Sequence, residues 1–178
     1  MPNIEIEFRA KISEEKYNWL NEFLMSNAKD IGQDNKETIF YILPDKLFKV
    51  VNEISKNKAK IVLKNNRIGN GSDFGEWEVL IDPKQYKTAV EIFNHLNLPG
   101  KSMKAWQERH NYIYKGIEIA VKFSEYWNHH IEMEIIIDDL EKKNEAERKI
   151  KNLADELDIK LMTDEEIKAF THAVEAKL

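Results

Sequence analysis

The sequence predicts an α+β fold in which about eight antiparallel strands form a closed or nearly closed barrel with a charged lumen. Amphipathic helices are expected to wrap this barrel, and the whole of 1–178 is expected to be a single domain. Several segments alternate charged and apolar side chains, which is typical of strands with one polar and one apolar face. Short turns join most of these segments and indicate antiparallel pairing. The helices need apolar surface to cover, so the apolar strand faces are expected outside and the charged faces inside.

The composition is that of a globular protein, with 33% of the 178 residues charged and 42% hydrophobic. The sequence contains no cysteine, which excludes disulfides, zinc–thiolate sites and thiol nucleophiles. No apolar run approaches the roughly 20 residues of a membrane span, and the first residues lack a signal-peptide layout, so we expect a cytoplasmic protein. The net charge of −5 gives no general attraction to nucleic acid or to anionic membranes. We therefore expect neither nucleic acid nor a membrane as a partner, and the sequence is compatible with a homodimer.

The first strand is expected over residues 4–12, where polar and apolar residues alternate strictly. Its polar face carries two acids followed by two bases: Glu5, Glu7, Arg9 and Lys11. Ser13 is a suitable N-cap for a helix over residues 14–27. The polar segment 27–36 is expected to be a loop.

The later elements follow from the same alternation and from turn and cap residues. Strands are expected over these segments: 37–43, 47–54, 58–64, 76–81, 105–114, 117–123 and 131–137. Residues 65–75 and 126–130 are expected to be loops. Asp82-Pro83 predicts the start of a helix, and a further helix is expected over about residues 141–158. Thr163 with Glu166 predicts a capping box that opens a final helix.

Charged residues recur on alternate positions of these strands. Three strands carry paired acids: Glu5 with Glu7, Glu76 with Glu78, and Glu132 with Glu134. Bases alternate on the same or other strands: Arg9, Lys11, Lys49, Lys58, Lys60, Lys64, Arg109 and Lys122. Carboxylates at this density in one lumen require a cation between them, and all-oxygen sites select Mg²⁺ or Mn²⁺. The surrounding bases suit a polyanion whose phosphates bridge the metal and the cationic side chains.

Glu5-x-Glu7-x-Arg9 on the first strand is similar to the Glu-x-Glu-x-Lys signature of the CYTH superfamily, the triphosphate tunnel metalloenzymes. That superfamily includes class IV adenylate cyclases, thiamine triphosphatases and inorganic triphosphatases. Further segments resemble its pattern in chain order: Lys64 at a strand end, Glu76/Glu78, Gln107 to Tyr112 with Arg109, and Ile131 to Glu134. The resemblance covers nearly the whole chain and implies a helix-wrapped barrel with a charged lumen.

Three departures from that pattern matter for function. Arg9 replaces a lysine, and arginine does not lose its proton to serve as a base. Lys49 is all that remains where the family usually shows an Arg-x-Arg pair. Lys122 stands where an aspartate is common, and Trp127-Asn128-His129 replaces a glycine-rich turn. These departures support the binding of an anion better than its turnover.

The leading hypothesis is a metal-dependent hydrolase of triphosphate compounds: tripolyphosphate, thiamine triphosphate or a nucleoside triphosphate. Metal ligands are expected to be Glu5, Glu7, Glu132 and Glu134, with Glu76 and Glu78 as supporting acids. Catalytic roles are assigned to Glu5, Glu7 and Lys11. Phosphate contacts are assigned to Arg9, Lys11, Lys49, Lys64, Arg109 and Lys122. A class IV adenylate cyclase, a non-catalytic barrel that binds polyphosphate or a nucleotide, and a structural module whose charges face solvent are the alternatives.

Three further expectations concern single residues. Lys122 should lie within ion-pair distance of Glu132 or Glu134 and stay charged there, because opposite charges at about 4 Å outweigh partial desolvation. His129 and His130 are expected in an exposed turn. The four tryptophans are expected in the core or at its rim: Trp19, Trp77, Trp106 and Trp127.

Overall fold

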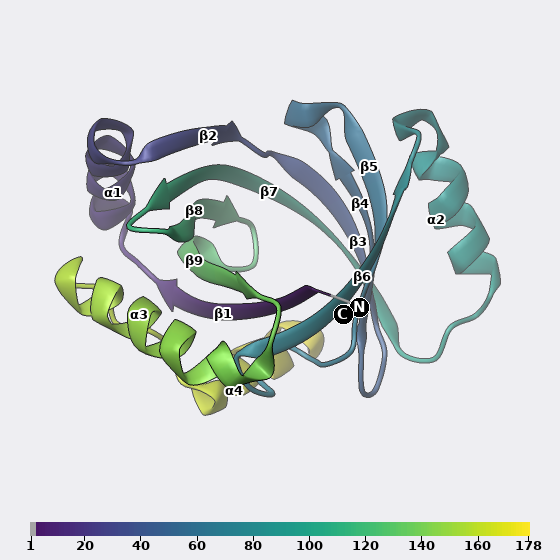
Figure 1. Cartoon of the computed structure of the whole chain (residues 1–178). Helices are drawn as coiled ribbons and strands as arrows, with labels where there is room; N and C mark the ends of the chain where they lie inside the picture. The colour runs from purple at the N-terminus through teal and green to yellow at the C-terminus, as the bar shows by residue number, and fades with distance from the viewer. Residues whose placement is uncertain (1–2) are drawn as a thin grey trace.

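Nine strands form one antiparallel sheet in the computed structural model, which describes residues 3–178 (Figure 1). The strands are β1 (Asn3–Lys11), β2 (Lys29–Gln33), β3 (Lys36–Ile42), β4 (Leu47–Glu53), β5 (Lys58–Lys64), β6 (Asp73–Ile81), β7 (Lys101–Tyr114), β8 (Ile117–Ser124) and β9 (Asn128–Ile137). Eight of them follow the order β7-β3-β4-β5-β6-β1-β9-β8, and β8 pairs again with β7. The predicted closed antiparallel barrel is therefore confirmed, with β2 as an additional strand on β7.

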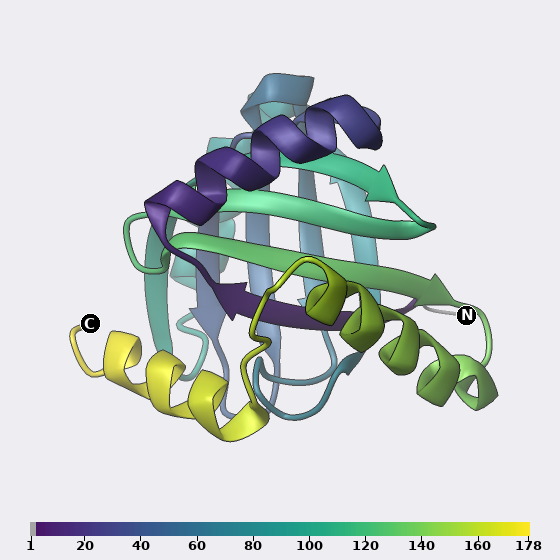
Figure 2. The same cartoon turned by 90° about the vertical axis from the view of Figure 1, so that its left-hand side faces the viewer.

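Four α-helices lie outside the barrel: α1 (Glu14–Asn27), α2 (Tyr86–His95), α3 (Lys143–Glu156) and α4 (Asp164–Glu175). Figure 2 shows α1 and α3 on the side formed by β1, β8 and β9, and Figure 1 shows α2 on the opposite side. The capping predictions are confirmed, because Ser13 accepts a hydrogen bond from the Lys16 backbone N–H, and Thr163 and Glu166 form a reciprocal box. No helix among the described residues has the length and apolar character needed to cross a membrane.

The alternation on β1 shows why the barrel has a charged interior. Ile6 and Ala10 are fully buried in the larger core, where they pack with Leu24 of α1 and Ile150 of α3. Glu5, Glu7 and Arg9, which alternate with them, point to the other face, into the lumen. A smaller core lies between α2 and the outer faces of β3, β4 and β5. Because the helices cover the apolar outer faces of the strands, the charged faces lie inside the barrel.

Several strand boundaries differ from the sequence predictions. Residues 29–33 form β2 instead of part of a loop, because their backbone pairs with β7, from Lys29 opposite Ile113 to Gln33 opposite His110. This pairing relies on main-chain hydrogen bonds and leaves no side-chain alternation to read. The strand predicted from residue 105 begins at Lys101. The preceding Gly100 has φ +104° and packs so tightly against the Ile42 carbonyl that no Cβ would fit.

The buried contact of α3 with the barrel should contribute most of that helix's stabilisation. We expect Ile150→Ala to lower the free energy of unfolding by about 2–5 kcal/mol, because it empties a fully buried site. Ile92→Ala on α2, where the side chain is exposed, is the matched control and should cost less than about 1 kcal/mol. Urea unfolding followed by circular dichroism measures both, and equal effects would contradict this packing.

Candidate functional site

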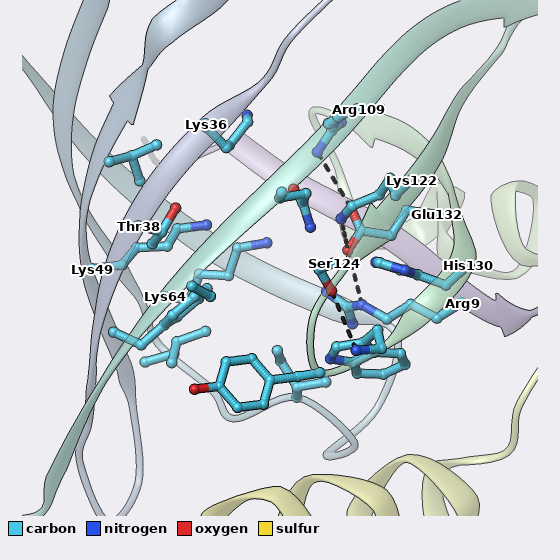
Figure 3. A pocket seen from close by; sticks show the side chains of 18 of the residues that line it. Arg9, Lys36, Thr38, Lys49, Lys64, Arg109, Lys122, Ser124, His130 and Glu132 are labelled. Carbon is cyan, nitrogen blue, oxygen red and sulfur yellow. Dashed lines mark hydrogen bonds and ion pairs between the residues drawn. The ribbon is translucent and has the colours of Figure 1, made fainter.

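The lumen of the barrel is a cavity of about 370 Å³ whose lining comes from all eight barrel strands and from α4. Figure 3 shows lysines of β3, β4 and β5 on one wall and Arg9, Arg109 and Lys122 on the other. Charged side chains from strands far apart in sequence therefore meet in one enclosed space, as the alternation predicted.

Glu132 of β9 is surrounded by three cations. Its carboxylate lies 2.6 Å from Lys122 Nζ, 3.0 Å from Arg9 Nε and 3.4 Å from Arg109 Nη1 (Figure 3). Strand register produces this cluster, because Arg9 on β1 stands directly opposite Glu132. Burial raises the pKa of Glu132, but Lys122, Arg9 and Arg109 together hold it well below its usual value. Glu132 is therefore ionised and already paired.

Lys122 confirms one expectation and corrects another. It is buried and pairs with Glu132, as predicted. Burial, however, together with the nearby Arg109 and Arg9, lowers the pKa of Lys122 to about 7, although Glu132 acts in the opposite direction. The expectation that this lysine stays fully charged is wrong near neutral pH, because one carboxylate is shared among three cations.

A second cluster contains more acids than cations. Glu5 and Glu7 of β1 and Glu134 of β9 each have a carboxylate oxygen within 4.8 Å of the others. Burial and then the neighbouring Glu5 and Glu7 raise the pKa of Glu134 to about 8. Three carboxylates held this close, with the pKa of one of them raised by burial and by the other two, fit a hard divalent cation. The group omits Glu132, which the sequence had placed among the metal ligands.

Lys64 of β5 is the cation nearest to these acids. Its ammonium nitrogen lies 2.7 Å from Glu5, 3.2 Å from Glu7 and 3.4 Å from Glu76. Burial lowers the pKa of Lys64, but Glu7, Glu5 and Glu76 outweigh it, so the pKa is raised. Lys49 lies beside it, 3.9 Å from Glu76. The predicted residues Lys49, Lys64 and Glu76 thus share one wall of the lumen.

The lumen also contains charges that sequence reasoning missed. Asp34 lies between β2 and β3 and is buried, with one oxygen 2.8 Å from Lys36 Nζ and 3.3 Å from Lys56 Nζ. Glu53 stands 3.8 Å from the same Lys36 nitrogen. Burial, with Arg109 nearby, lowers the pKa of Lys36 to about 8. The alternation of Lys36 with Thr38 and Phe40 was a usable signal, whereas Asp34 stands outside any strand and gave none.

Solved structures share this architecture, although no family model and no curated protein matches the chain. A conserved hypothetical protein from Pyrococcus furiosus superposes with a TM-score of 0.74 at 24% identity, covering 88% of this chain and 91% of that chain. A candidate adenylate cyclase from Vibrio parahaemolyticus gives 0.68 at 14%, covering 93% of both. A candidate adenylyl cyclase from Hippeastrum, described as having a dominant triphosphatase activity, gives 0.62 at 14%, covering 89% of both.

The chain has the same helix-wrapped barrel fold as these solved structures. The architecture predicted from the strand motifs is therefore confirmed. At these identities the likeness concerns the fold, and activity must be argued from the site.

Three residues lie elsewhere than the sequence predicted. Lys11 does not line the cavity; it is exposed, with its ammonium 3.5 Å from the centre of the Phe170 ring. Glu78 is also absent from the described lining and pairs at 2.7 Å with Lys60. His130 is not in an exposed turn but is 2% exposed within β9, and burial lowers its pKa to about 3. Lys11 is the last residue of β1, and His130 lies in the part of β9 that the sequence had assigned to a loop.

The raised pKa of Glu134 predicts a pH-dependent cost of folding. The unfolded chain ionises this carboxyl near its ordinary pKa, whereas the folded chain ionises it near pH 8, so its ionisation opposes folding increasingly as pH rises between those values. Glu134→Gln should therefore gain stability relative to the parent across that window, by at least about 2 °C in Tm at pH 8.

Thermal unfolding from pH 5 to 9 without metal measures this difference. Glu91→Gln, an exposed position on α2, is the control and should shift evenly at every pH. Adding Mg²⁺ should raise the parent's Tm more than that of Glu134→Gln, since the metal replaces the proton. A difference that stays constant with pH would contradict the assignment.

Proposed function

We propose that this protein hydrolyses a triphosphate compound with the help of Mg²⁺ or Mn²⁺. One observation carries the proposal: the oxygens of Glu5, Glu7 and Glu134 converge within 4.8 Å inside a lumen whose two walls carry buried cations. The acids in the lumen attract a metal cation, and the bases attract a polyphosphate anion. Together they are complementary to a metal–polyphosphate complex. The triphosphatase activity described for the Hippeastrum neighbour is consistent with this.

The lumen residues divide into two roles. Glu5, Glu7 and Glu134 would hold the metal, which when bound supplies positive charge next to the phosphoryl oxygens. Arg9, Arg109 and Lys64 are rigidly paired in the structure and would hold the phosphate chain in line for attack by water. Arg9 cannot act as a base, so its role is to bind. Lys11, which points away toward Phe170, has no part in this arrangement.

Phosphate release tests the proposal directly. Purified protein with Mg²⁺ or Mn²⁺ should release phosphate from at least one of tripolyphosphate, thiamine triphosphate and ATP. The double variant Glu5→Ala/Glu7→Ala should lose about 100-fold or more of this activity, because it removes two metal ligands. Glu14→Ala/Glu15→Ala, two exposed acids of α1, is the matched control. No release above the level of the Glu5→Ala/Glu7→Ala variant would reject hydrolysis.

A non-catalytic binding role is the second candidate, and the cluster around Glu132 favours it. Lys122 and Arg9 both pair with that carboxylate. Both side chains would favour the binding of an anion over the activation of a nucleophile. Tight binding of tripolyphosphate by calorimetry without any phosphate release would select this role. The cyclase alternative requires cyclic AMP and pyrophosphate among the products of ATP, which chromatography detects.

Lys122 should contribute to phosphate affinity under either role. We expect Lys122→Asp to weaken tripolyphosphate binding by roughly 1.5–3 kcal/mol, about 10- to 150-fold, since it removes a charge-assisted contact. The loss should be larger at pH 6.5 than at pH 8.5, because the pKa of Lys122 is about 7. If the missing acid limits catalysis, the same change should raise turnover.

Lys160→Asp, which changes the same charge on an exposed side chain, is the control. Calorimetry at both pH values measures the effect. Unchanged affinity in Lys122→Asp would remove this lysine from the binding site.

A further inference from the structure

The second half of β6 has a strand along one edge only. Residues 77–81 pair in unbroken register with β5. On the other edge, β1 begins with Asn3 opposite Glu76, in the middle of β6, and runs back along residues 73–76 (Figure 1). No strand of the described chain lies along residues 77–81 on that side. This free edge therefore presents main-chain N–H and C=O groups that lack a strand partner within the described residues.

The side chains of this segment are apolar and exposed on both faces of the sheet. Val79 and Leu80 are 63% and 65% exposed, the highest values among the large apolar side chains of residues 3–178. Because they are adjacent, strand alternation points them to opposite faces. Trp77, on the same face as Val79, is also exposed. Residues 77–81 therefore form an apolar strip around an open strand edge.

The edge of β2 shows what protection against pairing looks like in this molecule. That strand carries the charged Lys29 and Asp30, and a register shift between Asp30 and Gly32 interrupts its ladder. Charges and irregularities of this kind prevent a second chain from pairing with an edge strand. The free edge of β6 has only Glu78 as a charge, and Lys60 of β5 already pairs with it at 2.7 Å. This edge is suited to receive another strand.

A second copy of the chain fits this edge by symmetry. The free segment is bounded at one end by β1 and at the other by Pro83, where the chain leaves the sheet for η2 (Pro83–Gln85). Two such segments that pair antiparallel over their whole length must place Val79 opposite Val79 of the partner subunit. We propose that the protein forms a two-fold symmetric dimer in which the β6 strands pair edge to edge over residues 77–81.

Side chains across this pairing are compatible. Trp77 faces Ile81 of the partner subunit, and aromatic and β-branched side chains form favourable cross-strand pairs. Glu78 faces Leu80 of the partner subunit, so no like charges meet within the segment. The exposed apolar strip is buried, and the sheets of the two barrels become continuous. The inference goes beyond the proposed hydrolysis and does not depend on it, because residues 77–81 are absent from the described lining of the lumen.

Cross-linking tests the position of the two-fold axis. The chain has no cysteine, so Val79→Cys introduces a single thiol in each copy. Paired strands would hold the two Cα atoms about 4.5–5.5 Å apart, within the range of a disulfide. Mild oxidation should therefore link the subunits of this variant, as a non-reducing gel would show. Met25→Cys, at a comparably exposed position of α1 on another side of the barrel, is the control and should not cross-link.

Light scattering after size-exclusion chromatography, over a range of concentrations, should show a dimer for the parent. Val79→Lys should weaken this dimer by about 10-fold or more, because it sets two like charges opposite each other and removes buried apolar surface. Mixing Val79→Lys with Val79→Glu should restore a dimer, since opposite charges then meet at the axis. Met25→Lys is the control and should dimerise like the parent.

A parent that is monomeric at every concentration would overturn the proposal and leave the edge to an extended segment of another protein. A dimer that Val79→Lys leaves intact, or that Val79→Cys does not cross-link, would also overturn it, because the contact would then lie elsewhere. Circular dichroism establishes that each variant folds. Should Val79→Lys unfold, Leu80→Lys on the other face of the same edge takes its place, and the cross-linking result stands by itself.

Discussion

The structure depends on the compensation of buried charge inside a closed sheet. Helices α1, α2 and α3 bury the apolar outer faces of the strands, so strand alternation places their charged faces in the lumen, away from bulk water. Glu132 is tolerated there because three cations surround it, and Lys64 because three acids do. Each of these ions is costly to bury alone, which ties the stability of the barrel to the pairing in its centre.

Compensation in the lumen is uneven, and this unevenness indicates a function. Around Glu132 there are more cations than acids, and burial together with Arg109 and Arg9 lowers the pKa of Lys122. Around Glu5, Glu7 and Glu134 the acids are in excess, and burial together with Glu5 and Glu7 raises the pKa of Glu134. Opposite imbalances on neighbouring strands are relieved together by a divalent cation at the acids and a polyanion at the bases. This complementarity to a metal ion and a polyanion is required both for a protein that only binds a triphosphate and for one that hydrolyses it.

The fold and part of the site could be read from the sequence because both follow from strand alternation. On β1 every second residue is charged, and register with β9 then brings Arg9 opposite Glu132 and Glu7 opposite Glu134. Residues outside such patterns escaped prediction: β2 is held by main-chain pairing, and Asp34 reaches the lumen from a connection between strands. The sequence had grouped Glu132 with Glu5, Glu7 and Glu134 as metal ligands. Their separation into a paired Glu132 and a cluster of the other three depends on distances across the barrel, and spacing along the sequence does not give these distances.

The central claim is that the lumen holds a metal ion and a phosphate chain together. A crystal of the protein grown with Mn²⁺ and tripolyphosphate tests it most directly, because the anomalous signal of manganese locates the ion independently of the phosphates. We predict one anomalous peak among the oxygens of Glu5, Glu7 and Glu134, with phosphate density between it and the side chains of Arg9, Arg109 and Lys64. A lumen without manganese and phosphate, or manganese bound only on the outer surface, would contradict the account.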